Sequence, residues 1–264
     1  ENFVDQVDAV YVVSHPNLHY SHVKTALEHK KHVLCETPIA LTTDQAKNLF
    51  AFAKEQGCVL MEALKTAYST AFYRLTLLAK SGVIGDVISV DATCTSLREI
   101  QKVDETVACE NWSSLCEWGP IAMLPVFQMF GTGYISKNIV SKLPNPEIVF
   151  DTFTKIHFLY PHATATIKVG KGVKSEGELI ISGTKGYIYV PAPWWKTDYF
   201  EIRYENPANN RRYFYQLDGE GIRYELVAFS KSIELSKNNE RYFCSQEQSY
   251  FGIRFQNNIF NVDD

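Results

Sequence analysis

The residues best suited to chemistry in this sequence stand where two predicted strands end. Glu36-Thr37-Pro38 follows a strand predicted at residues 33–35, and Lys65 closes a strand predicted at residues 59–63. Ligands of open α/β folds bind where parallel strands end. Glu36 can line a pocket there, and Pro38 fixes the turn. The hydroxyl of Thr37 can donate one hydrogen bond but carries no charge near neutral pH, whereas Lys65 could supply a positive charge. A lysine that is merely solvated at a strand end is the simpler interpretation.

A second polar turn follows an apolar run at residues 9–13, which is typical of a parallel strand buried on both faces. Its sequence is Ser14-His15-Pro16-Asn17-Leu18-His19, and we predict that Asn17 caps the next helix. His15, His19 and His22 could share one side of this turn and helix start, as metal ligands would. The alternative is that they are ordinary turn and helix-cap residues.

The elements that position these turns alternate between strand and helix. Thr42 and Gln45 form a predicted capping box, and Gly57 is predicted to end the helix that follows. Strand, helix, strand, helix and strand with short links predict parallel pairing with right-handed crossovers. We therefore interpret residues 1–66 as the C-terminal half of a dinucleotide-binding domain, an α/β fold with a partial doubly wound parallel sheet.

The pattern changes after residue 66. Ser69 or Thr70 is predicted to cap a helix that closes at Gly82. Residues 88–95 then alternate between apolar and polar side chains, which predicts a strand with one covered face. Further strands are expected at 147–158, 162–169, 177–182, 186–190, 198–204 and 211–217, and a helix at about 222–235. Residues 67–264 are thus predicted to form an α/β domain with an open, mostly antiparallel sheet.

Composition excludes several classes of partner. The 264 residues carry a formal net charge of −4, which gives no electrostatic case for binding nucleic acid or an anionic membrane. No window approaches the ~18 consecutive apolar residues of a membrane span, and residues 1–5 lack the features of a signal peptide. The six cysteines show no CxxC pair or zinc-ligand spacing, so we expect reduced thiols in a cytoplasmic protein.

These motifs together resemble the Gfo/Idh/MocA (glucose–fructose oxidoreductase/inositol dehydrogenase) family. The resemblance is carried by residues 7–19, 31–38 and 60–63, and it continues through 82–87 and, more weakly, 183–188. It implies a Rossmann domain followed by an open-sheet α/β domain, and NAD- or NADP-dependent chemistry on sugar-like alcohols. It also implies turn and helix-cap roles near the cofactor for His15 and His19, and no metal. The residues implied to contact the cofactor are Ser14, His15, Pro16, Asn17, His19, Glu36 and Pro38.

The sequence departs from the family pattern at the positions that perform its chemistry. Thr37 stands where the family has lysine. The family's Asp and His, four residues apart on one helix, fall on Leu124 and Gln128, and Pro125 is expected to disturb that helix. The first glycine is Gly57, so the glycine-rich phosphate turn is not seen, and roughly 60 residues of the domain's first half are expected to be absent.

Two functions follow from this combination. The first is an NAD(P)-dependent oxidoreductase-family protein acting on a sugar or polyol. Lys65 and Thr37 are its candidate catalytic residues, Tyr68 and Gln128 its candidate substrate contacts, and its activity is in doubt. The alternative is a non-catalytic sugar-binding or assembly module on the same scaffold. We expect weak NAD(P) binding by this chain and a homodimer or higher oligomer formed through the second domain. The loop at 191–196 could stack on a sugar ring or simply pack.

Overall fold

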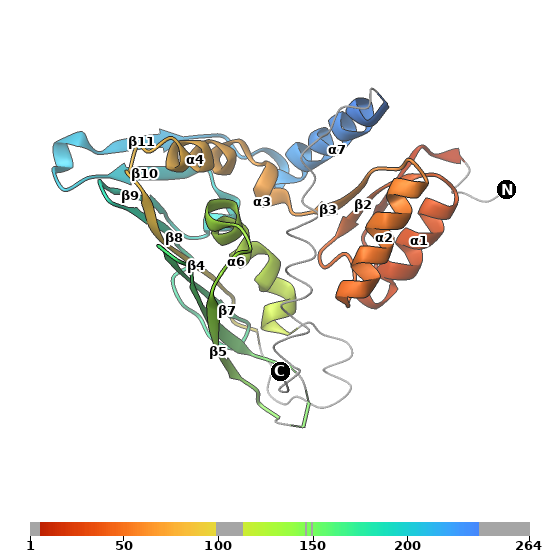
Figure 1. Ribbon diagram of the computed structural model, residues 1–264, viewed down its shortest axis with the longest axis horizontal. Coiled ribbons are helices and arrows are strands. Elements are labelled where there is room, and N and C mark those ends of the chain that lie inside the picture. Colours follow the sequence, from red (N-terminus) through yellow and green to blue (C-terminus); the bar gives the residue numbers. More distant parts are fainter. Residues whose placement is uncertain (1–5, 99–112, 146, 149, 238–264) are drawn as a thin grey trace. The chain divides into compact units, whose positions relative to one another are not determined.

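The computed structural model describes residues 6–98, 113–145, 147, 148 and 150–237 (Figure 1). The chain divides after Lys65 and after Gly221 into two compact units, and the first unit combines both ends of the chain. The sequence interpretation assigned all of 67–264 to one domain. The structure instead groups helix α7 (Ile222–Lys237) with the first unit, in which Glu225, Ala228 and Phe229 of this helix are buried.

The first unit is built on a three-stranded parallel sheet in the order β1-β2-β3, as predicted. One face packs on two helices through a buried cluster that includes Val33, Cys35, Leu27 and Leu49. Successive side chains of a strand point to opposite faces, so Leu34 lies on the face opposite Val33 and Cys35. Tyr11 pairs with Leu34 in register, and its side chain therefore lies on that opposite face as well. The elements are β1 (Ala9–Val12), α1 (His19–Glu28), β2 (His32–Glu36), α2 (Thr43–Glu55) and β3 (Leu60–Ala63).

Local signals predict both ends of α2 correctly but not the N-terminal cap of α1. Thr42 Oγ1 accepts a hydrogen bond from the Gln45 backbone N–H at 3.1 Å, and Gly57 stands just past the end of α2 with φ = 67°, both as predicted. The predicted cap at Asn17 is wrong. Residues Pro16–Leu18 form a 3₁₀ turn, and the ring of His15 accepts from the Asn17 N–H at 3.4 Å.

The second unit is built on an eight-stranded sheet in the order β11-β10-β9-β8-β4-β7-β6-β5. Strands β4 and β7 pair in parallel and the other neighbours in this sheet are antiparallel, which confirms the predicted open, mostly antiparallel sheet. The edge strand at 136–142 is a strand that sequence reasoning missed, because its residues are mostly polar or charged. The strands are β4 (Val87–Thr95), β5 (Ser136–Lys142), β6 (Phe153–Leu159), β7 (Thr164–Gly170), β8 (Leu179–Gly183), β9 (Tyr187–Val190), β10 (Tyr199–Arg203) and β11 (Arg211–Phe214).

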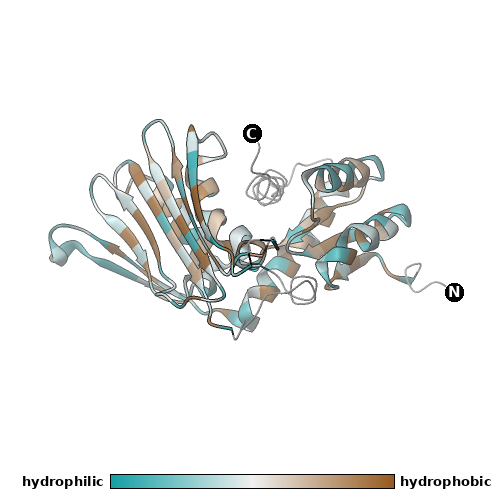
Figure 2. Cartoon of the chain, turned by 90° about the horizontal axis from the view of Figure 1, so that it is seen from below, coloured by the Kyte–Doolittle hydropathy of each residue, from teal (hydrophilic) through white to brown (hydrophobic). Residues whose placement is uncertain are grey.

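The described helices of this unit lie on one face of the sheet, and no described element of the unit covers the other face. Helix α6 (Ser114–Phe130) lies along β4 and β7, and α4 (Thr70–Lys80) packs beside it (Figure 1). Hydrophobic and hydrophilic residues alternate along the strands (Figure 2). Helix α6 continues through Pro120 and Pro125, so the predicted disturbance at Pro125 does not end it. Each proline removes one helical hydrogen bond, but the helix keeps Leu115, Ala122 and Val126 fully buried. Short elements complete the described chain: α3 (Lys65–Tyr68), η3 (Trp194–Lys196), η4 (Pro207–Asn209) and η5 (Asp218–Gly221).

Two glycine motifs that carried the family resemblance meet in this unit. The Lys185 N–H donates to the Ile84 carbonyl at 2.8 Å, and the Thr184 N–H donates to the Asp86 carbonyl at 3.0 Å. A Cβ atom on Gly183 would lie 2.3 Å from the Ile84 carbonyl oxygen. The glycines therefore permit close contact between two segments about 100 residues apart in sequence, rather than contact with a ligand.

Candidate functional site

The two polar turns predicted from sequence lie together at the carboxyl edge of the three-stranded sheet, and one histidine joins them. His19 is fully buried. Its Nε2 lies 2.7 Å from the carbonyl oxygen of Ser14, and its Nδ1 lies 2.8 Å from that of Pro38. A neutral imidazole can donate to only one of these carbonyls at a time. The histidine thus ties the turn after β1 to the turn after β2, which is a tertiary role beyond that of a helix cap.

The turn after β2 is also held from the neighbouring strand. Glu36 ends β2, and the Thr37–Pro38 peptide bond is cis. The buried carboxylate of Glu62, on β3, accepts a hydrogen bond from the Ile39 N–H at 3.2 Å. Glu36 and Thr37 are half-buried, so both side chains stay partly accessible in a turn whose backbone is fixed on two sides.

A cluster that sequence reasoning missed occupies the face of this sheet opposite α1 and α2. The Tyr11 hydroxyl donates to Glu36 Oε1 at 2.5 Å and lies 3.4 Å from Oε1 of Glu225 on α7. The sequence does hold one sign that Glu225 is buried. Glu225 stands three residues before Ala228 and four before Phe229, which places it on the apolar side of its helix. Nothing local in the sequence pairs it with Tyr11, 214 residues away.

The electrostatics of this cluster favour the protonated forms of Glu225 and Tyr11. Burial raises the pKa of Glu225 to about 7, and the negative charge of Glu36 contributes in the same direction. The nearby ammonium of Lys65 and the hydrogen bond from Tyr11 act against this rise. Burial and the contact with Glu36 also raise the pKa of the Tyr11 phenol well above its ordinary value, so it remains a hydroxyl.

Lys65 is the first residue of α3 and therefore stands just beyond the carboxyl end of β3, as predicted. Its side chain is half-buried, and its charge acts on Glu225. A structural counter-charge for buried acids is thus one role for it. Its expected closeness to Thr37 and to the turn at residues 14–19 stays a prediction.

The two candidate substrate residues belong to the second unit. Tyr68 ends α3, and Gln128 lies near the end of α6, where its Oε1 accepts a hydrogen bond from Thr76 Oγ1 at 3.1 Å. Leu124, one turn earlier, is buried. By resemblance, Leu124 and Gln128 stand at the positions of the family's Asp and His, and neither the Leu nor the Gln side chain can act as a base.

The described residues contain no group of three or more His, Cys, Asp or Glu side chains that could hold a metal ion. The histidines of the first turn are engaged locally instead, since His22 Nδ1 lies 2.9 Å from Ser14 Oγ. The four described cysteines are free, and burial raises the pKa of the thiols of Cys35 and Cys94 well above the ordinary value. Cys109 and Cys244 lie outside the described residues. Within the described chain no helix is long and apolar enough to cross a membrane.

The loop at 191–196 packs rather than presents its aromatic side chains. Trp194 is fully buried, and its Nε1 donates to the Thr93 carbonyl at 3.0 Å. Trp195 lies against Trp118 with ring centroids 4.9 Å apart. The sugar-stacking interpretation is therefore wrong for Trp194, whose faces are covered by core residues such as Phe72.

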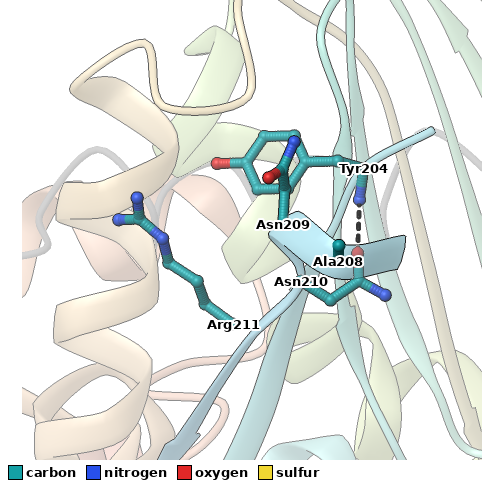
Figure 3. A pocket seen from close by; sticks show the side chains of 5 residues that line it. All are labelled: Tyr204, Ala208, Asn209, Asn210 and Arg211. Carbon is teal, nitrogen blue, oxygen red and sulfur yellow. Dashed lines mark hydrogen bonds between the residues drawn. The ribbon is translucent and has the colours of Figure 1, made fainter. Parts of the chain in front are cut away.

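A separate hollow of about 430 Å³ lies at the β10–β11 hairpin and is lined by Tyr204, Ala208, Asn209, Asn210 and Arg211 (Figure 3). The Asn210 side chain accepts from the Tyr204 N–H at 2.8 Å, which closes the turn. The side chains that line this hollow are mostly exposed amides and a guanidinium. They include no carboxylate or imidazole that could move a proton.

A parallel sheet with helices and converging carboxyl-edge turns, followed by an open sheet with helices on one face, defines a two-unit α/β protein of Rossmann type. Residues 1–64 match the GFO_IDH_MocA family, described as an oxidoreductase family with an NAD-binding Rossmann fold. The first unit of this chain is therefore similar to that family over residues 1–64.

Two curated proteins illustrate the similarity in sequence. A dTDP-3,4-didehydro-2,6-dideoxy-α-D-glucose 3-reductase from Actinomadura kijaniata is 38% identical over 91 residues, which are 34% of this chain and 27% of the relative. The uncharacterized oxidoreductase YhhX of Escherichia coli is 27% identical over 185 residues, which are 68% of this chain and 52% of the relative. The chain thus spans between about a quarter and a half of these relatives.

The fold itself recurs in a solved structure. An inositol dehydrogenase homolog from Azotobacter vinelandii, crystallised with NADH and myo-inositol, superposes with a TM-score of 0.80 at 13% identity. The match covers 95% of this chain and 74% of that chain. At this level of identity the likeness concerns the fold.

The turns after β1 and β2 differ from the glycine-rich turns that bind the pyrophosphate of a dinucleotide. Pyrophosphate binds on backbone N–H groups of a glycine-rich turn. The turns after β1 and β2 contain Pro16 and Pro38, which lack an N–H, and the first glycine of the chain is Gly57. These two turns therefore offer fewer backbone N–H donors than a glycine-rich phosphate turn.

Proposed function

We propose that this chain is part of an NAD(P)-dependent oxidoreductase that acts on a sugar or polyol hydroxyl. The observation that carries the proposal is the His19 bridge, which fixes both carboxyl-edge turns of a unit whose residues 1–64 match an NAD-binding family. Supporting it, the relatives include a sugar-nucleotide reductase, and a structural neighbour was crystallised with NADH and myo-inositol.

The chain's own residues have distinct roles in this proposal. The turn at residues 14–19 and the Glu36-Thr37-Pro38 turn form one wall beside the cofactor. Lys65 holds the substrate hydroxyl through its ammonium, Thr37 donates one hydrogen bond, and Tyr68 and Gln128 contact the sugar. A bound nicotinamide supplies or accepts the hydride. The cofactor is NAD or NADP, the protein is cytoplasmic, and it forms a homodimer or larger oligomer through the open sheet.

The second candidate function is a sugar-binding or assembly module without catalysis. The observation that favours it is the pair Leu124 and Gln128, which removes the acid–base dyad that the family resemblance places on this helix. Binding of a sugar in the absence of any cofactor is the expected behaviour of such a module.

The test uses protein expressed from its complete reading frame and an assay of sugar- or polyol-dependent NAD(P) reduction. Lys65→Met is expected to lower kcat by about 10²–10⁴-fold, the magnitude of a lost proton-transfer or positioning group. Thr37→Lys is expected to preserve or raise activity. Lys54→Met, which removes an exposed lysine of α2, is the matched control. Wild-type activity in Lys65→Met rejects the role of Lys65. Sugar binding without any turnover in the wild type favours the module.

A further inference from the structure

One hydroxyl lies between two carboxylates in the first unit. The Tyr11 oxygen is 2.5 Å from Glu36 Oε1 and 3.4 Å from Glu225 Oε1. A phenol has a single proton, so it can donate to only one of these acceptors. The shorter distance assigns that proton to Glu36. The contact with Glu225 is then favourable only when Glu225 carries its own proton and directs it at the phenol oxygen.

The surroundings of Glu225 also favour a proton on this side chain. The residue is 1% exposed, and its Oε2 has no hydrogen-bond partner among the described residues. An ionised carboxylate with an unsatisfied buried oxygen is strongly disfavoured. The charged and titratable groups acting on it are Tyr11 from β1, Glu36 from β2 and Lys65 from α3. The pKa of about 7 is consistent with a proton that is held but exchangeable near neutral pH.

The chain of groups ends at the proposed site. Glu36 is the last residue of β2 and precedes Thr37, which the proposed function makes a hydrogen-bond donor in the site. Glu36 is half-buried, whereas Glu225 lies on the interior side of Tyr11. The three residues therefore connect a buried proton donor, Glu225, to a partly accessible carboxylate at the carboxyl edge of the sheet.

We propose that Glu36, Tyr11 and Glu225 form a proton relay for the substrate hydroxyl, an inference that rests on the proposed oxidoreductase function. Reduction of a ketone would take a hydride from a bound nicotinamide and needs a proton at the carbonyl oxygen. The phenol proton of Tyr11 moves to Glu36 while the proton of Glu225 moves to the Tyr11 oxygen, and Glu36 delivers its proton to the substrate. The end state has ionised Glu36, intact Tyr11 and ionised Glu225. Oxidation of a secondary alcohol runs the same transfers backwards and starts from ionised Glu225.

The first test is a ¹³C NMR titration of the chain with labelled glutamate carboxyls. One carboxyl is expected to titrate near pH 7 and to vanish in Glu225→Gln. In Glu36→Gln its midpoint is expected to fall by about one pH unit, because a neighbouring negative charge is removed. Glu55→Gln, an exposed glutamate of α2, is the control and leaves the signal unchanged. The absence of any glutamate titrating above pH 6 overturns the relay.

The second test is the pH profile of the complete protein. Tyr11→Phe keeps the ring but removes the bridging oxygen, and it is expected to lower kcat by about 10²-fold with little change in KM. Glu225→Gln is expected to remove the inflection of kcat near pH 7. Wild-type profiles in both variants overturn the relay and leave the oxidoreductase function standing. A wild type without turnover whose Glu225 titrates as expected overturns the oxidoreductase function, and the relay's catalytic use falls with it.

Discussion

At the scale of single residues, the site depends on buried polar groups whose burial and contacts were not predicted from the sequence. His19 spans the Ser14 and Pro38 carbonyls from a fully buried position. We expect His19→Ala to destabilise the protein by about 2–4 kcal/mol, because it opens a cavity and removes the imidazole N–H from the carbonyl that accepts it. His22→Ala, which truncates an exposed histidine of the same helix, is the control and should stay within about 0.5 kcal/mol. Chemical denaturation measures both, and equal effects would reject the bridging role.

Glu225 gives a residue-scale prediction with a defined sign. Its pKa rises from 4.5 to about 7 on folding, so the folded state keeps a proton that the unfolded chain loses at lower pH. Stability therefore falls as pH increases through this window. Glu225→Gln has no such loss, and at pH 8 it should be more stable than wild type by roughly 2 kcal/mol, after allowance for solvent screening.

The check on this prediction is a comparison of unfolding free energies at two pH values. The advantage of Glu225→Gln should be largest at pH 8 and should disappear well below pH 4.5, where wild-type Glu225 is protonated in both states. A pH-independent difference would show that the substitution changes packing and not a titration.

At the scale of elements, the close approach of two glycine motifs holds the start of β4 against the β8–β9 turn. A Cβ atom on Gly183 would meet the backbone oxygen of Ile84 at 2.3 Å, which no side-chain movement can relieve. We expect Gly183→Ala to destabilise the second unit by about 2–3 kcal/mol. Gly133→Ala is the matched control, since no atom lies within 4 Å of its added Cβ. Thermal unfolding followed by circular dichroism distinguishes them, and similar melting temperatures would contradict the packing argument.

At the scale of the whole molecule, the open face of the eight-stranded sheet is the surface that we expect to associate. Phe214 is 74% exposed, Val140 60% and Leu159 45%, and the strand register places all three on the face opposite α6. The Phe214 ring lies 4.6 Å from that of Tyr199, centroid to centroid. Exposed apolar side chains on such a face favour burial against a second copy.

Light scattering is expected to give at least twice the chain mass of 30.1 kDa. Leu159→Asp with Phe214→Asp should shift the protein toward monomer, whereas Leu77→Asp, an exposed residue of α4, should not. A wild type that is monomeric at micromolar concentration rejects association through this sheet.

The sequence by itself determined what short-range patterns encode. The capping box at Thr42, the positive-φ Gly57 and the run of strand and helix signals predicted the parallel three-stranded unit, and the alternation at 88–95 predicted a half-covered strand. These features depend on residues a few positions apart, so their physical causes are visible in the chain itself. The same local patterns carried the family resemblance.

Only the tertiary structure decided which groups meet. Glu225 contacts Tyr11, 214 residues away in sequence, and His19 contacts the Pro38 carbonyl on another turn. Trp194 is buried in the core, although the sequence left open that its loop stacks on a sugar ring. Helix α6 continues through two prolines because burial of its apolar residues outweighs two lost hydrogen bonds. Each of these outcomes depends on packing between distant segments, for which no local pattern in the sequence has a signal.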